Sequence, residues 1–80
     1  MKSKNEEIAL KKLGERIREL RIKKGYTNYE HFAYENGISR TQYGKYEKGE
    51  NLKFLTFLKV LKGLDVSVSE FFKDCDIELD

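Results

Sequence analysis

Residues 29–48, YEHFAYENGISRTQYGKYEK, set the architecture, because they read as two short helices that meet at one sharp turn. Ala33 is small and lies where a second helix must come close. Gly37 follows four residues later, and glycine adopts the left-handed conformation that ends a helix without a Cβ penalty. Ile38 then enters the core. Ser39 can cap the next helix by accepting a hydrogen bond from a free backbone N–H group.

The second of these helices, expected over residues 40–48, has two different faces. Tyr43 and Tyr46, three residues apart, are expected to anchor it in the core, with stacking on bases as the alternative. The opposite face carries side chains that can reach phosphates and base edges, namely Arg40, Thr41, Gln42, Lys45 and Lys48. This is the spacing of a helix-turn-helix, whose second helix lies in the major groove of DNA.

Three further helices are expected around this pair. A stripe of apolar residues at helical spacing predicts the first over residues 6–24, ended by Gly25. A rich apolar pattern predicts the fourth over residues 52–62, with one face made of Phe54, Phe57, Leu58, Leu61 and Leu64. Ser67 and Glu70 have the spacing of a capping box, which predicts the start of a fifth helix with an apolar face made of Val68, Phe71 and Phe72.

The chain is therefore expected to be all-α, with five short helices around one core. Its 80 residues are enough for a single domain with a small core. We expect that core to cover about residues 6–73, and the ends, residues 1–5 and 74–80, to be flexible.

The formal net charge of +2 is unevenly spread along the chain. Residues 1–48 carry a balance of +5 and residues 49–80 a balance of −3. The basic part therefore contains the helix expected over residues 40–48, here called the reading helix, and this suits a polyanionic partner. The alternative is that these charges simply cover solvated helix faces.

Other features of the sequence exclude several classes of function. Cys75 is the single cysteine, so an internal disulfide is excluded and a reducing compartment is favoured. One cysteine and one histidine, His31, cannot form a four-ligand zinc site. The 80 residues show no signal-peptide pattern, no apolar run long enough to span a membrane, no phosphate-binding glycine loop and no nucleophile–base set. We therefore expect a cytoplasmic protein, nucleoid-associated when it binds DNA, with no metal, no cofactor and no enzyme activity.

The chain resembles the lambda-repressor-like, Cro-type helix-turn-helix family, also called the xenobiotic-response-element family, over roughly residues 13–72. The matching segments are LGERIRELRIKKGYT, FAYENGIS, YEKG and LKGLDVSVSEFF. The resemblance implies a sequence-specific transcriptional regulator that binds double-stranded DNA, usually as a homodimer on a palindromic operator.

The resemblance also implies residue roles. Base reading falls to Arg40, Thr41, Gln42 and Lys45, and phosphate binding to Asn28, Tyr29, Ser39 and Lys48. Arg21 and Glu47 are expected to form an ion pair that locks the reading helix against the first helix. The chain departs from the family pattern at Tyr29, where glutamine is usual, at the tyrosines of the reading helix, and at Gly44 in the middle of that helix.

Two questions about partners stay open. The surplus of apolar residues on the fourth helix and at Phe71 and Phe72 favours a homodimer, although these residues could all fit in the core. An alternative function is an antitoxin-like module that holds a toxin and binds DNA only to control its own operon. Capture of a small toxin would favour this second interpretation.

Overall fold

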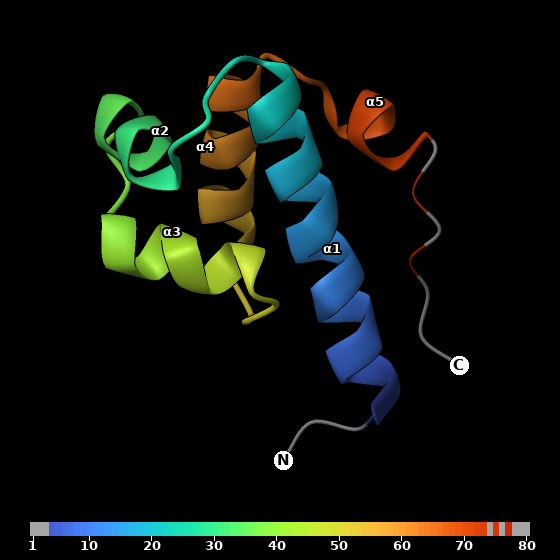
Figure 1. The fold of residues 1–80 in the computed structure, drawn as a ribbon. Helices are drawn as coiled ribbons and strands as arrows, with labels where there is room; N and C mark the ends of the chain where they lie inside the picture. The colour runs from blue at the N-terminus through green and yellow to red at the C-terminus, as the bar shows by residue number, and fades with distance from the viewer. Residues whose placement is uncertain (1–3, 74, 76, 78–80) are drawn as a thin grey trace.

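The computed structural model describes residues 4–73, 75 and 77, and these form five helices without any strand. The helices are α1 (Lys4–Lys23), α2 (Tyr29–Glu35), α3 (Arg40–Glu47), α4 (Phe54–Leu64) and α5 (Val68–Phe72). In Figure 1, α1 and α4 occupy the centre, α2 and α3 lie on one side of them, and α5 lies on the other. The all-α prediction with five helices is confirmed.

The helix α1 begins at Lys4, two residues before the start predicted at residue 6. Among the residues expected to be flexible, 1–3, 74, 76 and 78–80 lie outside the described residues. Cys75 and Ile77 are described and lie outside any helix.

Capping side chains fix the ends of the short helices as the sequence predicts. The Asn28 side chain accepts hydrogen bonds from the backbone N–H groups of Glu30 and His31 at the start of α2. At the start of α5, the Ser67 hydroxyl accepts from the Glu70 N–H, and the Glu70 carboxylate accepts from the Ser67 N–H. Since these bonds satisfy donors that a helix leaves free, helices of five to eight residues are stabilised at their first turn.

The fourth helix lies two residues further along the chain than its apolar pattern predicts. Lys53 has an extended backbone, with φ −71° and ψ 149°, so the helix begins at Phe54. It continues to Leu64, where Asp65 takes the left-handed conformation with φ 59°. The N–H groups of Asp65 and Val66 then donate to the carbonyls of Lys62 and Leu61, which closes the helix.

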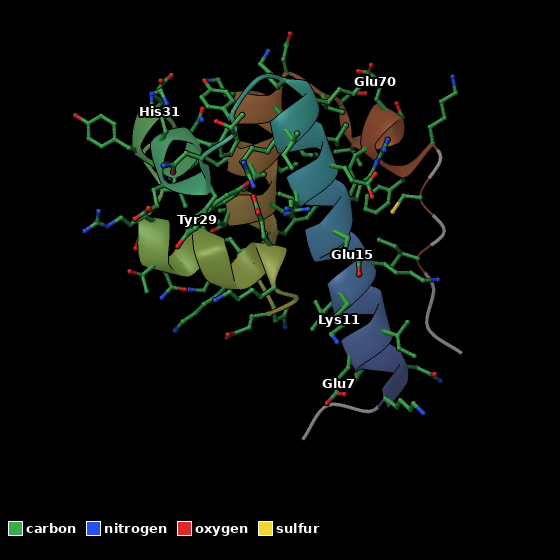
Figure 2. All side chains as sticks on the ribbon, in the orientation of Figure 1. Glu7, Lys11, Glu15, Tyr29, His31 and Glu70 are labelled. Carbon is green, nitrogen blue, oxygen red and sulfur yellow. The ribbon has the colours of Figure 1, made fainter. Side chains whose placement is uncertain are left out.

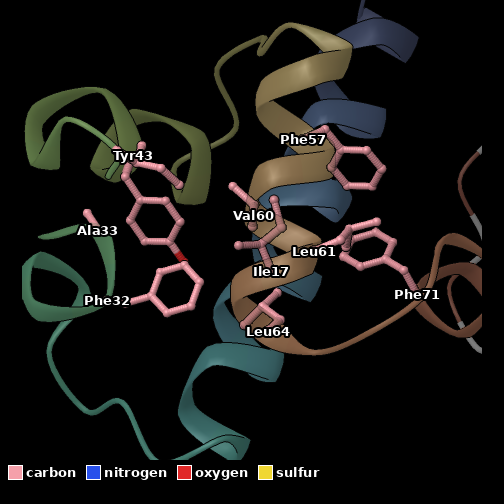
Figure 3. Close-up of a cluster of buried hydrophobic side chains, with 10 residues drawn as sticks. Ile17, Phe32, Ala33, Tyr43, Phe57, Val60, Leu61, Leu64 and Phe71 are labelled. Carbon is pink, nitrogen blue, oxygen red and sulfur yellow. The ribbon is translucent and has the colours of Figure 1, made fainter. Parts of the chain in front are cut away.

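The core lies between the central helices and extends to both sides (Figure 3). Its buried apolar members are Ile17, Phe32, Ala33, Ile38, Tyr43, Phe57, Val60, Leu61, Leu64 and Phe71. Three members of the predicted apolar faces of α4 and α5 are exposed, namely Phe54, Val68 and Phe72. The Arg16 Nε donates to the Phe71 carbonyl at 3.1 Å and so ties α5 to α1.

Two glycines permit close helix contacts that the sequence analysis did not single out. A Cβ atom on Gly14 of α1 would lie 2.5 Å from the Tyr46 carbonyl oxygen and 2.7 Å from that of Glu47, so α3 crosses α1 at backbone contact. A Cβ atom on Gly63 of α4 would lie 2.5 Å from the side-chain oxygen of Asn36. Gly14 therefore determines how closely the end of α3 approaches α1.

Candidate nucleic-acid interface

The helices α2 and α3 pack against each other through a tight turn and a shared aromatic contact. The Ile38 N–H donates to the Ala33 carbonyl at 2.9 Å, across Gly37, whose φ is +65°. The rings of Phe32 and Tyr43 lie 5.1 Å apart, and both are fully buried. This is the helix-turn-helix arrangement expected from the sequence, with Tyr43 in the core.

The face of α3 turned away from the core carries the residues predicted to read bases. All four, Arg40, Thr41, Gln42 and Lys45, are exposed, as is Lys48 at the end of the helix. The Arg40 side chain is 73% exposed and makes a loose ion pair with Glu30 of α2, with 3.6 Å between Nη1 and Oε2. These side chains are free to extend into a groove, because none of them is buried by the protein.

The residues predicted to bind phosphate lie at the surface of the same two helices. Asn28 and Ser39 are exposed and use their side-chain oxygens in capping, so the Asn28 amide N–H groups and the Ser39 hydroxyl hydrogen remain as donors. The structure therefore brings the eight predicted DNA contacts onto one helix pair. Their binding to DNA stays a prediction.

A buried ion pair fastens the end of α3 to α1. Arg21 donates from Nε to Glu47 Oε2 at 2.7 Å, from Nη2 to Glu47 Oε1 at 3.2 Å, and from Nη1 to the Tyr26 carbonyl. Arg21 is only 4% exposed. Hydrogen bonding to Glu47 raises the pKa of Arg21, although burial acts in the opposite direction. The ion pair expected from the family resemblance is present, and it holds the reading helix without facing a ligand.

Tyr43 completes this buried polar cluster. Its hydroxyl lies beside Arg21 and Glu47, and burial, with a smaller effect of Glu47, raises its pKa far above the usual range. Within the described residues the hydroxyl makes no hydrogen bond of good geometry. The bond it forgoes is offset by the large apolar area of a fully buried ring.

The structure pairs Tyr29 with Gly44, two departures from the family pattern. A Cβ atom at position 44 would lie 3.0 Å from Tyr29 Cε2, so the ring lies directly on the glycine. The Tyr29 and Tyr43 rings are stacked, with centroids 6.4 Å apart and 28° between their planes. Figure 2 shows Tyr29 reaching from α2 onto α3. Sequence reasoning noted both residues and did not connect them, because their separation of 15 residues carries no helical signal.

A second polar cluster lies on the outer side of α2. His31 pairs with Glu35, which also accepts a hydrogen bond from the Tyr26 hydroxyl at 3.0 Å. That bond raises the pKa of Tyr26. His31 is mostly exposed, and the described part of the chain holds no cluster of three potential metal ligands. None of the described helices combines the length and apolar character required to cross a membrane.

Comparison with known proteins assigns the chain to a family. A family profile described as "Helix-turn-helix domain" matches residues 14–76. "Control protein C.MunI" from Mycoplasma sp. is 31% identical over 68 residues, which cover 84% of this chain and 92% of that protein.

Solved structures agree with this assignment. The restriction-modification controller protein C.AhdI from Aeromonas hydrophila is 36% identical, covering 81% of this chain and 98% of that chain, with a TM-score of 0.74. Another controller protein, C.Esp1396I, solved as a tetramer with its natural 35-base-pair operator, is 32% identical, covering 81% of this chain and 86% of that chain, with a TM-score of 0.72. The resemblance to lambda-repressor-like domains is thereby confirmed, and the chain belongs to the helix-turn-helix family of DNA-binding transcriptional regulators.

Proposed function

We propose that this helix-turn-helix regulator places α3 in the major groove of an operator and reads its sequence with Arg40, Thr41, Gln42 and Lys45. The observation that carries the proposal is the exposed polar face of α3 on a helix held by a buried ion pair. Arginine and lysine can bond guanine O6 and N7, and threonine can contact a base edge or a thymine methyl.

With α3 in the major groove, the residues around it position the protein on the DNA backbone. Lys48 at the end of α3 meets a phosphate, and Asn28, Tyr29 and Ser39 donate to the backbone from the α2 side and the turn. Such contacts fix the register of a protein on the duplex and carry no base specificity. Salt lowers the affinity steeply, because each neutralised phosphate releases counterions.

We also propose that the protein binds DNA as a homodimer through the surface between α4 and α5. A hollow of about 290 Å³ lies there, lined mainly by apolar residues that include Leu52, Phe54, Phe57, Val68 and Phe72. Phe54 is 65% and Phe72 40% exposed, so this face holds apolar area that a second copy can cover. The controller protein solved on its operator is a tetramer, which supports an oligomeric binding unit. A two-fold dimer would place two copies of α3 about 34 Å apart, one turn of DNA.

Selection from a random duplex library tests the proposal. The expected product is a palindromic consensus, and Arg40→Ala should lose about 1–3 kcal/mol of discrimination against a scrambled duplex. Lys48→Ala should instead weaken binding to both duplexes alike and lower the salt slope by about 1 for each protomer. Recovery of no consensus, or equal losses on both duplexes for Arg40→Ala, would contradict the proposed reading face.

The antitoxin interpretation stays a prediction with its own test. A pull-down from the source cells that recovers a small toxin would give the chain a protein partner besides DNA. A cytoplasmic location, nucleoid-associated on binding, follows from the proposed operator and is part of the same proposal.

A further inference from the structure

Tyr29 and Gly44 meet where the start of α2 crosses the middle of α3. An ideal Cβ at position 44 would lie 3.0 Å from Cε2, 3.3 Å from Cζ and 3.4 Å from the hydroxyl oxygen of Tyr29. The phenol end of the ring therefore lies on α3, where it covers Gly44, a buried position that has no side chain. Tyr29 remains 39% exposed, so part of the residue is accessible from outside the protein.

We infer that Tyr29 and Gly44 form a matched pair that sets the position of the reading helix and holds the Tyr29 hydroxyl as a donor to a DNA phosphodiester group. The inference deepens the proposed function and rests on it. Tyr29 occupies the space beside position 44, and a Cβ there would require the ring to shift by a few tenths of an ångström. Gly44, in turn, leaves room for the ring, because it has no Cβ to meet Tyr29 Cε2 at 3.0 Å.

Stacking on Tyr43 connects the Tyr29 ring to the buried core. Tyr43 is fully buried against Phe32 and next to the Arg21–Glu47 pair. The Tyr29 ring is thus held from below by Tyr43 and from the side by the Gly44 backbone. A ring with two fixed contacts presents its hydroxyl in a defined place, which lowers the entropy lost when a phosphate binds.

Coupling between the two residues is the first test. The dissociation constant for the selected duplex is measured for the wild type, Gly44→Ala, Tyr29→Ala and the double variant. Gly44→Ala is expected to weaken binding about fivefold when Tyr29 is present and less than twofold in the Tyr29→Ala background, since contacting residues couple in such cycles. As a control, thermal unfolding followed by circular dichroism tests whether each variant is folded. The same factor in both backgrounds would overturn the pairing.

The hydroxyl is tested separately. Tyr29→Phe keeps the ring and is expected to weaken binding to selected and scrambled duplexes by about tenfold for each protomer bound, the value of one hydrogen bond to a charged group. The salt slope should stay unchanged, because a neutral donor releases no counterion. Tyr34→Phe, on the same helix and 84% exposed, is the matched control and should bind like the wild type.

The outcomes separate this inference from the proposed function. Wild-type affinity for Tyr29→Phe, or an equal loss for Tyr34→Phe, overturns the phosphate contact while the regulator itself still binds DNA. A wild-type protein that binds no duplex overturns the proposed function, and the phosphate contact with it.

Discussion

Replacing Arg21 with alanine should remove a large part of the stability of this protein. The substitution deletes three hydrogen bonds and leaves the Glu47 carboxylate, 9% exposed, beside the buried Tyr43 hydroxyl. Breaking one side of a buried pair typically costs about 3–5 kcal/mol. A chain of 80 residues has a free energy of unfolding of about 4–12 kcal/mol, so the loss is at least a quarter of the total.

Thermal unfolding followed by circular dichroism measures this loss. For a domain of this size about 1 kcal/mol corresponds to 4–8 °C, so the midpoint should fall by about 12 °C or more. Arg18→Ala, an exposed arginine on the same helix, is the matched control and should change the free energy by less than about 0.5 kcal/mol. A loss below about 1 kcal/mol for Arg21→Ala would refute the reasoning.

A double substitution tests whether the loss comes from the missing ion pair itself or from the unpaired charge that Arg21→Ala leaves buried. Arg21→Met with Glu47→Leu replaces both charges by apolar side chains and leaves neither partner unpaired. Such replacements are often neutral or stabilising, so the double variant should melt well above Arg21→Ala. If the double variant is as unstable as the single one, the uncompensated Glu47 carboxylate is not the cause of the loss.

The other predictions concern packing, pH and assembly. Gly14→Ala should destabilise the fold by about 1–3 kcal/mol or more, because its Cβ would meet backbone oxygens. Gly63→Ala should cost less, because the Asn36 amide that its Cβ would meet can shift at the loss of one hydrogen bond to the Phe32 carbonyl; chemical denaturation compares the two. The pKa of Glu70 is lowered from its ordinary 4.5 by hydrogen bonds from Ser67, so the stability it adds is full above about pH 4.5 and disappears as the pH falls below it. Melts of Glu70→Gln should therefore fall below the wild type at pH 7 and converge with it in acid, and a constant difference would contradict this. Phe54→Glu should shift the proposed dimer towards monomer in analytical ultracentrifugation, and an unchanged mass would exclude this surface as the interface.

The turn between α2 and α3 could be predicted from sequence because its signals are local. The small residue, the glycine and the capping serine stand at fixed offsets, and each has one physical role at its place. Gly37 does take the left-handed conformation, and Ser39 does cap α3. The same holds for the capping box at Ser67 and Glu70, whose two hydrogen bonds span three residues.

Contacts between distant segments were harder to predict. Gly14 fits any helical pattern, and only the packed structure shows that α3 crosses there at backbone distance. The ion pair between Arg21 and Glu47 spans 26 residues and was expected only through the family resemblance. The apolar pattern of α4 does not reveal its start, because Leu52 is apolar and half-buried without being helical.

Predicting the outer face of α3 required both local sequence signals and contacts between distant segments. Exposure of Arg40 and Lys45 follows from helical spacing once Tyr43 is assigned to the core. The contact of Arg40 with Glu30 depends on how α2 and α3 cross, which spacing does not determine. That contact places the Glu30 carboxylate next to Arg40, the proposed guanine reader.

The central claim is that the outer face of α3 is the surface that touches DNA, and nuclear magnetic resonance tests it most directly. Titration of the isotope-labelled protein with the selected duplex should shift the amide and side-chain signals of Arg40, Thr41 and Lys45 most strongly, with smaller changes at Tyr29. Shifts confined to α1 or to the hollow between α4 and α5, with the signals of α3 unmoved, would contradict it.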